Sequence, residues 1–138
     1  MREEISRLGL QGTVELLGHV PKSEVFDLYA ESDIFLFPSY REPSGNVVVE
    51  SISFGLPVIT TTVGGPGHVV SDKCGIRVPP QAPRRFESEL AKAIQVLGTD
   101  RALAQRMGRA ARDYVERVAL WPKKIDWMCN LYSDLQRT

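Results

Sequence analysis

The chain has 138 residues, of which 43% are hydrophobic and 25% are charged, as in one globular domain large enough to bury a core. Lys and Arg together number 17, and so do Asp and Glu, which gives a formal net charge of zero. This balance excludes a protein that binds nucleic acid mainly through general attraction to phosphates.

The cysteines and the apolar runs indicate the compartment. Cys74 and Cys129 have the spacing of neither a metal site nor a redox pair, so we expect free, buried thiols in a reduced, cytosolic protein. No apolar run approaches the about 18 residues of a membrane span, and residues 1–4 do not resemble a signal peptide. The sequence therefore predicts a protein that is cytoplasmic or at most peripheral at the inner face of a membrane.

Short apolar runs bounded by Gly and Pro alternate with helical patterns in the first part of the chain. The runs cover 13–20, 33–39, 57–61 and 75–80, and their β-branched and aromatic content is typical of strands buried on both faces. Between the first two, Ser23 can cap a helix that follows it. This alternation predicts the α/β class, with a parallel sheet flanked by helices.

The segment between the second and third runs contains three consecutive valines, 47–49, which favour a strand. If the flanking strands are parallel neighbours, however, the chain must cross back over the sheet here, usually through a helix. We therefore predict a short, largely buried helix over 46–54, stopped by Gly55. Ser44 or Asn46 would be its N-cap.

Beyond residue 80 the pattern is wholly helical. Pro83 opens a first helix, to Leu97. Asp100 can cap a second helix to about Ala119, and Pro122 opens a third. Seven basic side chains here are expected to form a solvated face, with contact to an anionic membrane surface or partner as the alternative: Arg101, Arg106, Arg109, Arg112, Arg117, Lys123 and Lys124.

Glu50 is the only charged residue in the apolar stretch 46–54. A helix that follows a strand of a parallel sheet begins at the carboxyl edge of the sheet, where ligands bind, and its N–H groups suit a phosphate. Gly45 would let backbone and ligand approach closely, with Glu42 over the ligand. Glu50 could then accept hydrogen bonds from vicinal hydroxyls such as those of a ribose. Alternatively, Glu42 is a loop charge and Glu50 pairs with a buried Arg or a backbone N–H group.

The stretch FPSYREPSGNVVVESISFGLPVITTTVGG, residues 37–65, resembles the signature of the family 4 retaining glycosyltransferases, also called group 1. In that family two glutamates separated by seven residues precede GxPV and a Gly-Gly loop, and here they are Glu42 and Glu50. The resemblance extends over 14–39, 68–80 and 100–135. It implies that residues 1–138 form a single, partial C-terminal donor-binding domain of an enzyme with two Rossmann-like domains, the GT-B fold.

The resemblance also implies roles for individual residues. Glu42 corresponds to the catalytic glutamate that contacts the donor sugar near the reacting centre, and Glu50 to the glutamate that binds the ribose. Gly45, Asn46 and Val47 match the loop and helix start whose backbone N–H groups meet the sugar and the diphosphate.

Two further segments match the family's donor site. His19 and Val20 correspond to the turn whose backbone contacts the base, and Gly64 and Gly65 to the Gly-Gly loop near the cleft, for which a structural turn is the alternative. His68 departs from the family, which usually has another glutamate after this loop. We expect His19 and His68 to be surface or hydrogen-bonded histidines rather than general bases.

The family domain has two strands, with an Arg and a Lys that neutralise the diphosphate, before the point where this sequence resembles it. In the family's strand order, 3-2-1-4-5-6, those strands lie between 14–18 and 34–38. We therefore expect the chain to close the gap, to pair with another chain in an oligomer that completes the sheet, or to leave an edge open.

The family's reaction is transfer of a sugar, typically a hexose, from a nucleoside-diphosphate sugar to an acceptor hydroxyl with retention. The donor is a substrate, and neither a cofactor nor a metal is expected. The acceptor, a sugar or a lipid-linked glycan of polysaccharide biosynthesis, would bind an N-terminal domain, so residues 1–138 alone are expected to be inactive. The alternatives are a non-catalytic nucleotide-binding or assembly module that needs a partner chain, and a related sugar-nucleotide epimerase.

Overall fold

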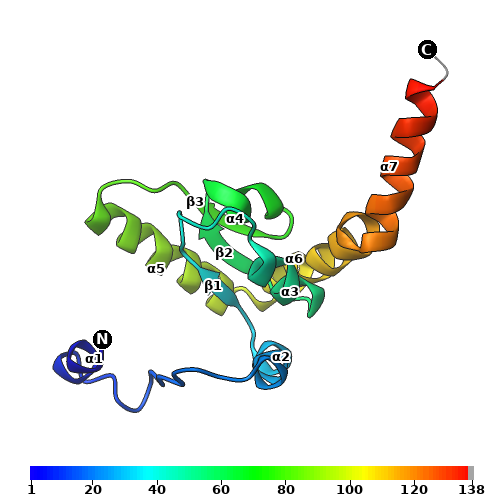
Figure 1. The fold of residues 1–138 in the computed structure, drawn as a ribbon. Coiled ribbons are helices and arrows are strands. Elements are labelled where there is room, and N and C mark those ends of the chain that lie inside the picture. The colour runs from blue at the N-terminus through cyan, green and yellow to red at the C-terminus, as the bar shows by residue number, and fades with distance from the viewer. Residues whose placement is uncertain (137–138) are drawn as a thin grey trace.

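The computed structural model describes residues 1–136, and a three-stranded parallel sheet lies at its centre (Figure 1). Its strands are β1 (Phe35–Phe37), β2 (Val58–Thr61) and β3 (Gly75–Val78), in the order β1-β2-β3. Ile59 of β2 lies opposite Leu36 on one side and Ile76 on the other. The strands predicted within 33–39, 57–61 and 75–80 are confirmed, and each lies inside its predicted run.

The sheet is covered on both faces, so consecutive residues of β2 point into different cores. Val58 packs with α3 (Asn46–Ser53) and α6 (Arg101–Tyr114), whereas Ile59 packs with α5 (Pro83–Thr99). All four residues of β2 are buried, as expected for a central strand of a parallel sheet. The predicted α/β class, a Rossmann-like parallel sheet flanked by helices, is confirmed.

Helix α3 forms where the valines favour a strand, because the chain must cross over the sheet between β1 and β2. Gly55, with φ +81°, ends it as predicted. The predicted N-cap is wrong. Ser44 instead donates its hydroxyl to Glu42, and Asn46 is the first helical residue, so the cap position falls on Gly45, with φ +70°.

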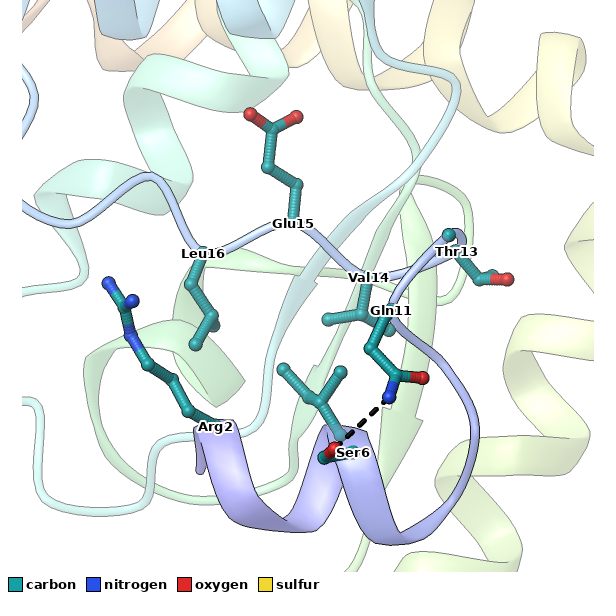
Figure 2. Close-up of a pocket in the computed structure, with 9 residues that line it drawn as sticks. Arg2, Ser6, Gln11, Thr13, Val14, Glu15 and Leu16 are labelled. Atoms are coloured by element: carbon teal, nitrogen blue, oxygen red, sulfur yellow. Dashed lines mark hydrogen bonds between the residues drawn. The ribbon is translucent and has the colours of Figure 1, made fainter.

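The prediction of a strand over 13–20 is wrong. Residues 14–18 have no regular secondary structure and lie apart from the sheet, between α1 (Arg2–Arg7) and α2 (Lys22–Glu31) in Figure 1. Val14 and Leu16 point toward α1 while Glu15 points away, so the alternation of a strand persists without a strand's hydrogen bonds (Figure 2). Within residues 1–136 no strand lies beside this segment, and extended backbone without a neighbour is not a strand.

The second edge of the gap is β1. The chain does not close the gap itself: β1 pairs only with β2 within the described residues, and Leu36 is 41% exposed. Pairing of this edge with another chain stays a prediction. Helix α2 packs beside it through aromatic contacts, with Tyr29 edge-on to Phe35 at 5.5 Å. The N-cap of α2 is Pro21 rather than the predicted Ser23, because a proline at this position loses no helical hydrogen bond.

The first two C-terminal helices begin at the predicted residues. Pro83 opens α5, and the Asp100 carboxylate accepts the Leu103 N–H at 2.8 Å to cap α6. The second helix does not run as an α-helix to Ala119, because a π-helical turn, η1 (Val115–Ala119), follows Tyr114.

The last helix, α7 (Trp121–Leu135), extends away from the sheet (Figure 1). It contributes no buried residue. Cys129, which lies on it, is therefore exposed, so the expectation of two buried thiols holds only for Cys74. Over residues 1–136, none of the helices combines the length and the apolar character that crossing a membrane would need.

Candidate functional site

The loop that follows β1 folds around the carboxylate of Glu42. One carboxylate oxygen, Oε1, accepts the Ser44 hydroxyl at 2.6 Å and the backbone N–H groups of Ser44 and Gly45, both at 3.0 Å. The spacing favours this arrangement, because a side chain oxygen can accept N–H groups two and three residues later in a turn. The side chain is thus fixed in one orientation at the carboxyl end of β1.

These hydrogen bonds also set the charge of Glu42. The hydroxyl of Ser44 and then the backbone N–H groups of Gly45 and Ser44 lower the pKa of the Glu42 carboxyl below its ordinary value of 4.5. Glu42 is therefore an anion at neutral pH. A fixed anion of this kind can orient a polar ligand or stabilise positive charge that develops on it.

The loop that follows β2 packs directly against the Glu42 loop. The Gly65 N–H donates to the Glu42 carbonyl oxygen at 2.9 Å. A Cβ atom on Gly65 would lie 2.5 Å from the Pro43 carbonyl oxygen, and one on Gly45 would lie 3.0 Å from the backbone nitrogen of Pro66. Glycine is needed at both positions because two backbones meet there.

The predicted loop of Gly64 and Gly65 is in fact the first turn of a helix, α4 (Gly64–Val69). It was predicted as a loop near the cleft, with a structural turn as the alternative. The two glycines bring the carboxyl ends of neighbouring parallel strands together, which is where α/β sheets bind ligands. Contact with a ligand by Gly64 or Gly65 stays a prediction.

Helix α3 begins at this meeting point. The N–H groups of Val48 and Val49 donate to the Gly45 carbonyl oxygen at 2.9 and 3.2 Å, and the Gly45 N–H donates to Glu42. The first turn therefore leaves the N–H groups of Asn46 and Val47 for a ligand. Of the three predicted backbone donors, Gly45 is already used by the protein.

Glu50 lies one turn further along α3 and is half-buried, as predicted. Its Oε1 accepts the Lys22 ammonium of α2 at 2.9 Å, with the Glu50 side chain 31% exposed and Lys22 70% exposed. The partner is thus an exposed lysine, and the alternative of a buried Arg or a backbone N–H group is wrong. Tyr29 lies close by: burial raises the pKa of its hydroxyl, the Glu50 charge raises it further, and Lys22 lowers it.

His19 and Val20 directly precede α2, the helix whose Lys22 contacts Glu50. His19 is exposed and Val20 half-buried, and both border a hollow of about 330 Å³ whose other walls include Glu24 and Asp27. Acidic walls suit a base or a hydroxyl better than a phosphate. His68 is exposed on α4, as expected of a surface histidine.

A second hollow, of about 590 Å³, lies between α1 and the extended segment that follows it, where Gln11 donates to Ser6 at 3.1 Å (Figure 2). Ile5, Val14 and Leu16 line it, and none of the predicted site residues does. It follows from the unpaired course of residues 14–18. We therefore place the candidate site at the ends of β1 and β2.

Sequence reasoning missed two residues of this site. Ser44 was expected as a helix cap, and the signal for its observed role was its place two residues after Glu42. Lys22 carried no local signal, since its contact with Glu50 joins residues 28 positions apart.

Comparison with known proteins identifies the family. The model of "Glycosyl transferases group 1" matches residues 1–114. A D-inositol 3-phosphate glycosyltransferase of Streptomyces bingchenggensis is 31% identical over 133 residues, which are 96% of this chain and 28% of that protein. The chain thus spans under a third of that relative's length.

Two solved structures share the fold. Sucrose-phosphate synthase from Thermosynechococcus elongatus is 30% identical with a TM-score of 0.81, over 99% of this chain and 33% of that one. Anabaena Alr3699/HepE, solved in complex with UDP and glucose, is 25% identical with a TM-score of 0.76, over 96% of this chain and 35% of that one. The family model matches most of this chain, and the chain shares its fold with these enzymes. The chain therefore belongs to the group 1 glycosyl transferases.

Proposed function

We propose that the chain is the donor-binding part of a glycosyltransferase that moves a sugar from a nucleoside-diphosphate sugar to an acceptor hydroxyl with retention. The observation that supports this most directly is the meeting of Glu42, the Gly65 loop and the start of α3 at one point. A fixed anion beside free helix N–H groups suits a ligand that joins a sugar to a diphosphate. The similar Anabaena protein was solved with UDP and glucose.

Each group has a role in this proposal. The N–H groups of Asn46 and Val47 bind the diphosphate, and Glu50 accepts the hydroxyls of the ribose. Glu42 orients the donor sugar and stabilises positive charge on its ring as the bond to the diphosphate breaks. His19 and Val20 meet the base through their backbone. Glu42 takes no proton in this scheme, because a carboxylate with a lowered pKa is a weak base.

The acceptor, a sugar or a lipid-linked glycan, would bind a separate N-terminal domain, and closure of the two domains would exclude water. We place the reaction in the cytoplasm or at the inner face of the membrane. The transfer needs no metal in this proposal, since helix N–H groups and cations stabilise the departing diphosphate. Turnover of the full-length enzyme should therefore be unchanged by EDTA.

The test is a calorimetric titration of the chain with UDP, GDP and ADP, with Glu50→Ala as the variant and Glu87→Ala, an exposed glutamate of α5, as the matched control. Saturable binding of one nucleotide, lost in Glu50→Ala and kept in Glu87→Ala, would support the proposal. A folded chain that binds none of the three would contradict it.

The open edge of β1 favours a second candidate, a nucleotide-binding module completed by a partner chain. This module would bind a nucleotide without turnover and form a defined oligomer. Light scattering after size exclusion distinguishes the two: a monomer that binds nucleotide supports the donor domain.

A further inference from the structure

We infer that Lys22 is a positioning residue of the nucleotide site, which holds the Glu50 carboxylate in place for a ribose diol. The inference rests on the proposed function, because it assigns Lys22 an effect only through a ligand on Glu50. It concerns the start of α2, a helix to which the proposed function assigns no contact with the donor.

The contact between the two side chains leaves half of the carboxylate available. The Lys22 ammonium lies 2.9 Å from Oε1 of Glu50, so Oε2 can accept a ligand hydroxyl without displacing the lysine. The Glu50 side chain is 31% exposed, so a nucleoside that binds it would cover an anion that is already half-buried. Covering an anion removes its water, and a neighbouring cation offsets that cost.

An aromatic ring on the same helix favours this position of the lysine. The Lys22 ammonium lies 5.6 Å from the centre of the Phe26 ring, in the range of a cation–π contact. Phe26 in turn stacks on Phe54, at the end of α3, with ring centres 5.7 Å apart. The ammonium is thus held between the helix that carries it and the helix that carries Glu50.

The pair also joins the proposed base contact to the proposed ribose contact. Lys22 follows Val20 by two residues, so the ion pair ties the turn of His19 and Val20 to α3. A structural role alone is a weak explanation, because Lys22 is 70% exposed and exposed ion pairs contribute little to stability. The Lys22→Met variant should therefore fold normally.

The experiment is a calorimetric titration of the full chain with UDP and with 2′,3′-dideoxy-UDP. The variants are Lys22→Met and Lys22→Arg, with Lys73→Met, an exposed lysine near β3, as the matched control. We expect Lys22→Met to weaken UDP binding ~3–10-fold and to leave dideoxy-UDP binding unchanged, since the dideoxy ligand offers no hydroxyls to Glu50. Lys22→Arg should restore most of the affinity for UDP.

The outcomes separate this inference from the proposed function. Equal weakening of both ligands by Lys22→Met would mean a purely structural role and would overturn the inference. The inference would also be overturned if the preference of the wild-type chain for UDP over dideoxy-UDP were undiminished in Lys22→Met. A wild-type chain that binds both ligands equally, or does not bind UDP, would instead contradict the proposed role of Glu50, and the inference with it.

Discussion

The backbone N–H of Gly65 donates to the carbonyl oxygen of Glu42 at 2.9 Å, which fastens the loop after β2 to the loop after β1. The carboxylate of the same Glu42 is held from the other side by Ser44 and Gly45. The proposed site is therefore one backbone assembly, and changes to any of its members should affect the others.

Replacing Gly65 with Ala tests this assembly. The new Cβ would lie 2.5 Å from the Pro43 carbonyl oxygen, so the two loops must separate. We expect a loss of about 1–3 kcal/mol in the free energy of unfolding, measured in urea, together with weaker nucleotide binding. Gly98→Ala is the control, because nothing lies within 4 Å of the new methyl group. Since alanine is favoured over glycine in a helix, this variant should raise the free energy of unfolding by roughly 0.5–1 kcal/mol. A Gly65→Ala chain as stable as wild type would contradict the close contact.

The charge of Glu42 should appear in the pH dependence of stability. Because its pKa in the folded chain lies below the ordinary 4.5, the folded state binds this proton less readily than the unfolded state. The stabilisation is complete above about pH 4.5 and is lost as the pH falls through the lower, folded pKa. Urea unfolding at pH 6.5 and 3.0 should thus show Glu42→Gln less stable than wild type at the higher pH, with a smaller difference at the lower.

Other carboxylates with lowered pKa values, Glu4 and Glu89, are common to both chains and cancel in that comparison. Glu87→Gln on α5 supplies the control for removal of an exposed charge. A difference between wild type and Glu42→Gln that is the same at both pH values would show that the carboxylate charge is not stabilised by the loop.

Kinetics of the full-length enzyme should separate the two glutamates. Glu42→Ala should lower kcat by roughly 10²–10³ with donor affinity little changed, because its charge acts on the transition state. Glu50→Ala should instead weaken donor binding by about 10–100-fold, as expected for losing hydrogen bonds to a charged group. If both variants changed donor affinity alone, this division of roles would be wrong.

Arg112 lies on α6 and should stabilise the C-terminal end of α3. Its guanidinium donates to the Phe54 carbonyl oxygen at 2.9 Å, at the C-terminal end of α3, where a cation is favoured. Arg112→Met should lower the free energy of unfolding by about 0.5–1.5 kcal/mol in urea. Arg109→Met, an exposed neighbour on the same helix, should stay within about 0.5 kcal/mol of wild type. If both variants changed the free energy of unfolding equally, the Arg112 hydrogen bond to Phe54 would not contribute to stability.

The sequence could predict the sheet and the crossover helix, because topology decides between helix and strand where propensity is ambiguous. The valines of α3 favour a strand locally, but β1 and β2 can be parallel neighbours only if this segment crosses the sheet. The same kind of pattern failed over 13–20, since a strand requires a neighbour that no periodicity in the segment itself reveals. The hydrophobic alternation is present there (Figure 2), but within the described residues no strand lies beside it.

The candidate site was predictable in its residues but not in its contacts. Motif spacing placed Glu42, Glu50 and the glycines at one edge of the sheet, and the structure brings Glu42, Gly45 and Gly65 together there. The occupied N–H of Gly45 and the ion pair of Glu50 with Lys22 depend on tertiary packing. Local sequence holds no information on which donors the protein has already used.

The π-helical turn of η1 and the extended Leu120 that follows it lie between α6 and α7. None of the residues of α7 is buried. Local unfolding of α7 therefore exposes almost no buried surface. A lone helix of about 15 residues is marginal in water. In terms of cooperativity, we therefore expect the amide protons of β2 to exchange only by global unfolding, whereas those of α7 exchange by fraying of the helix.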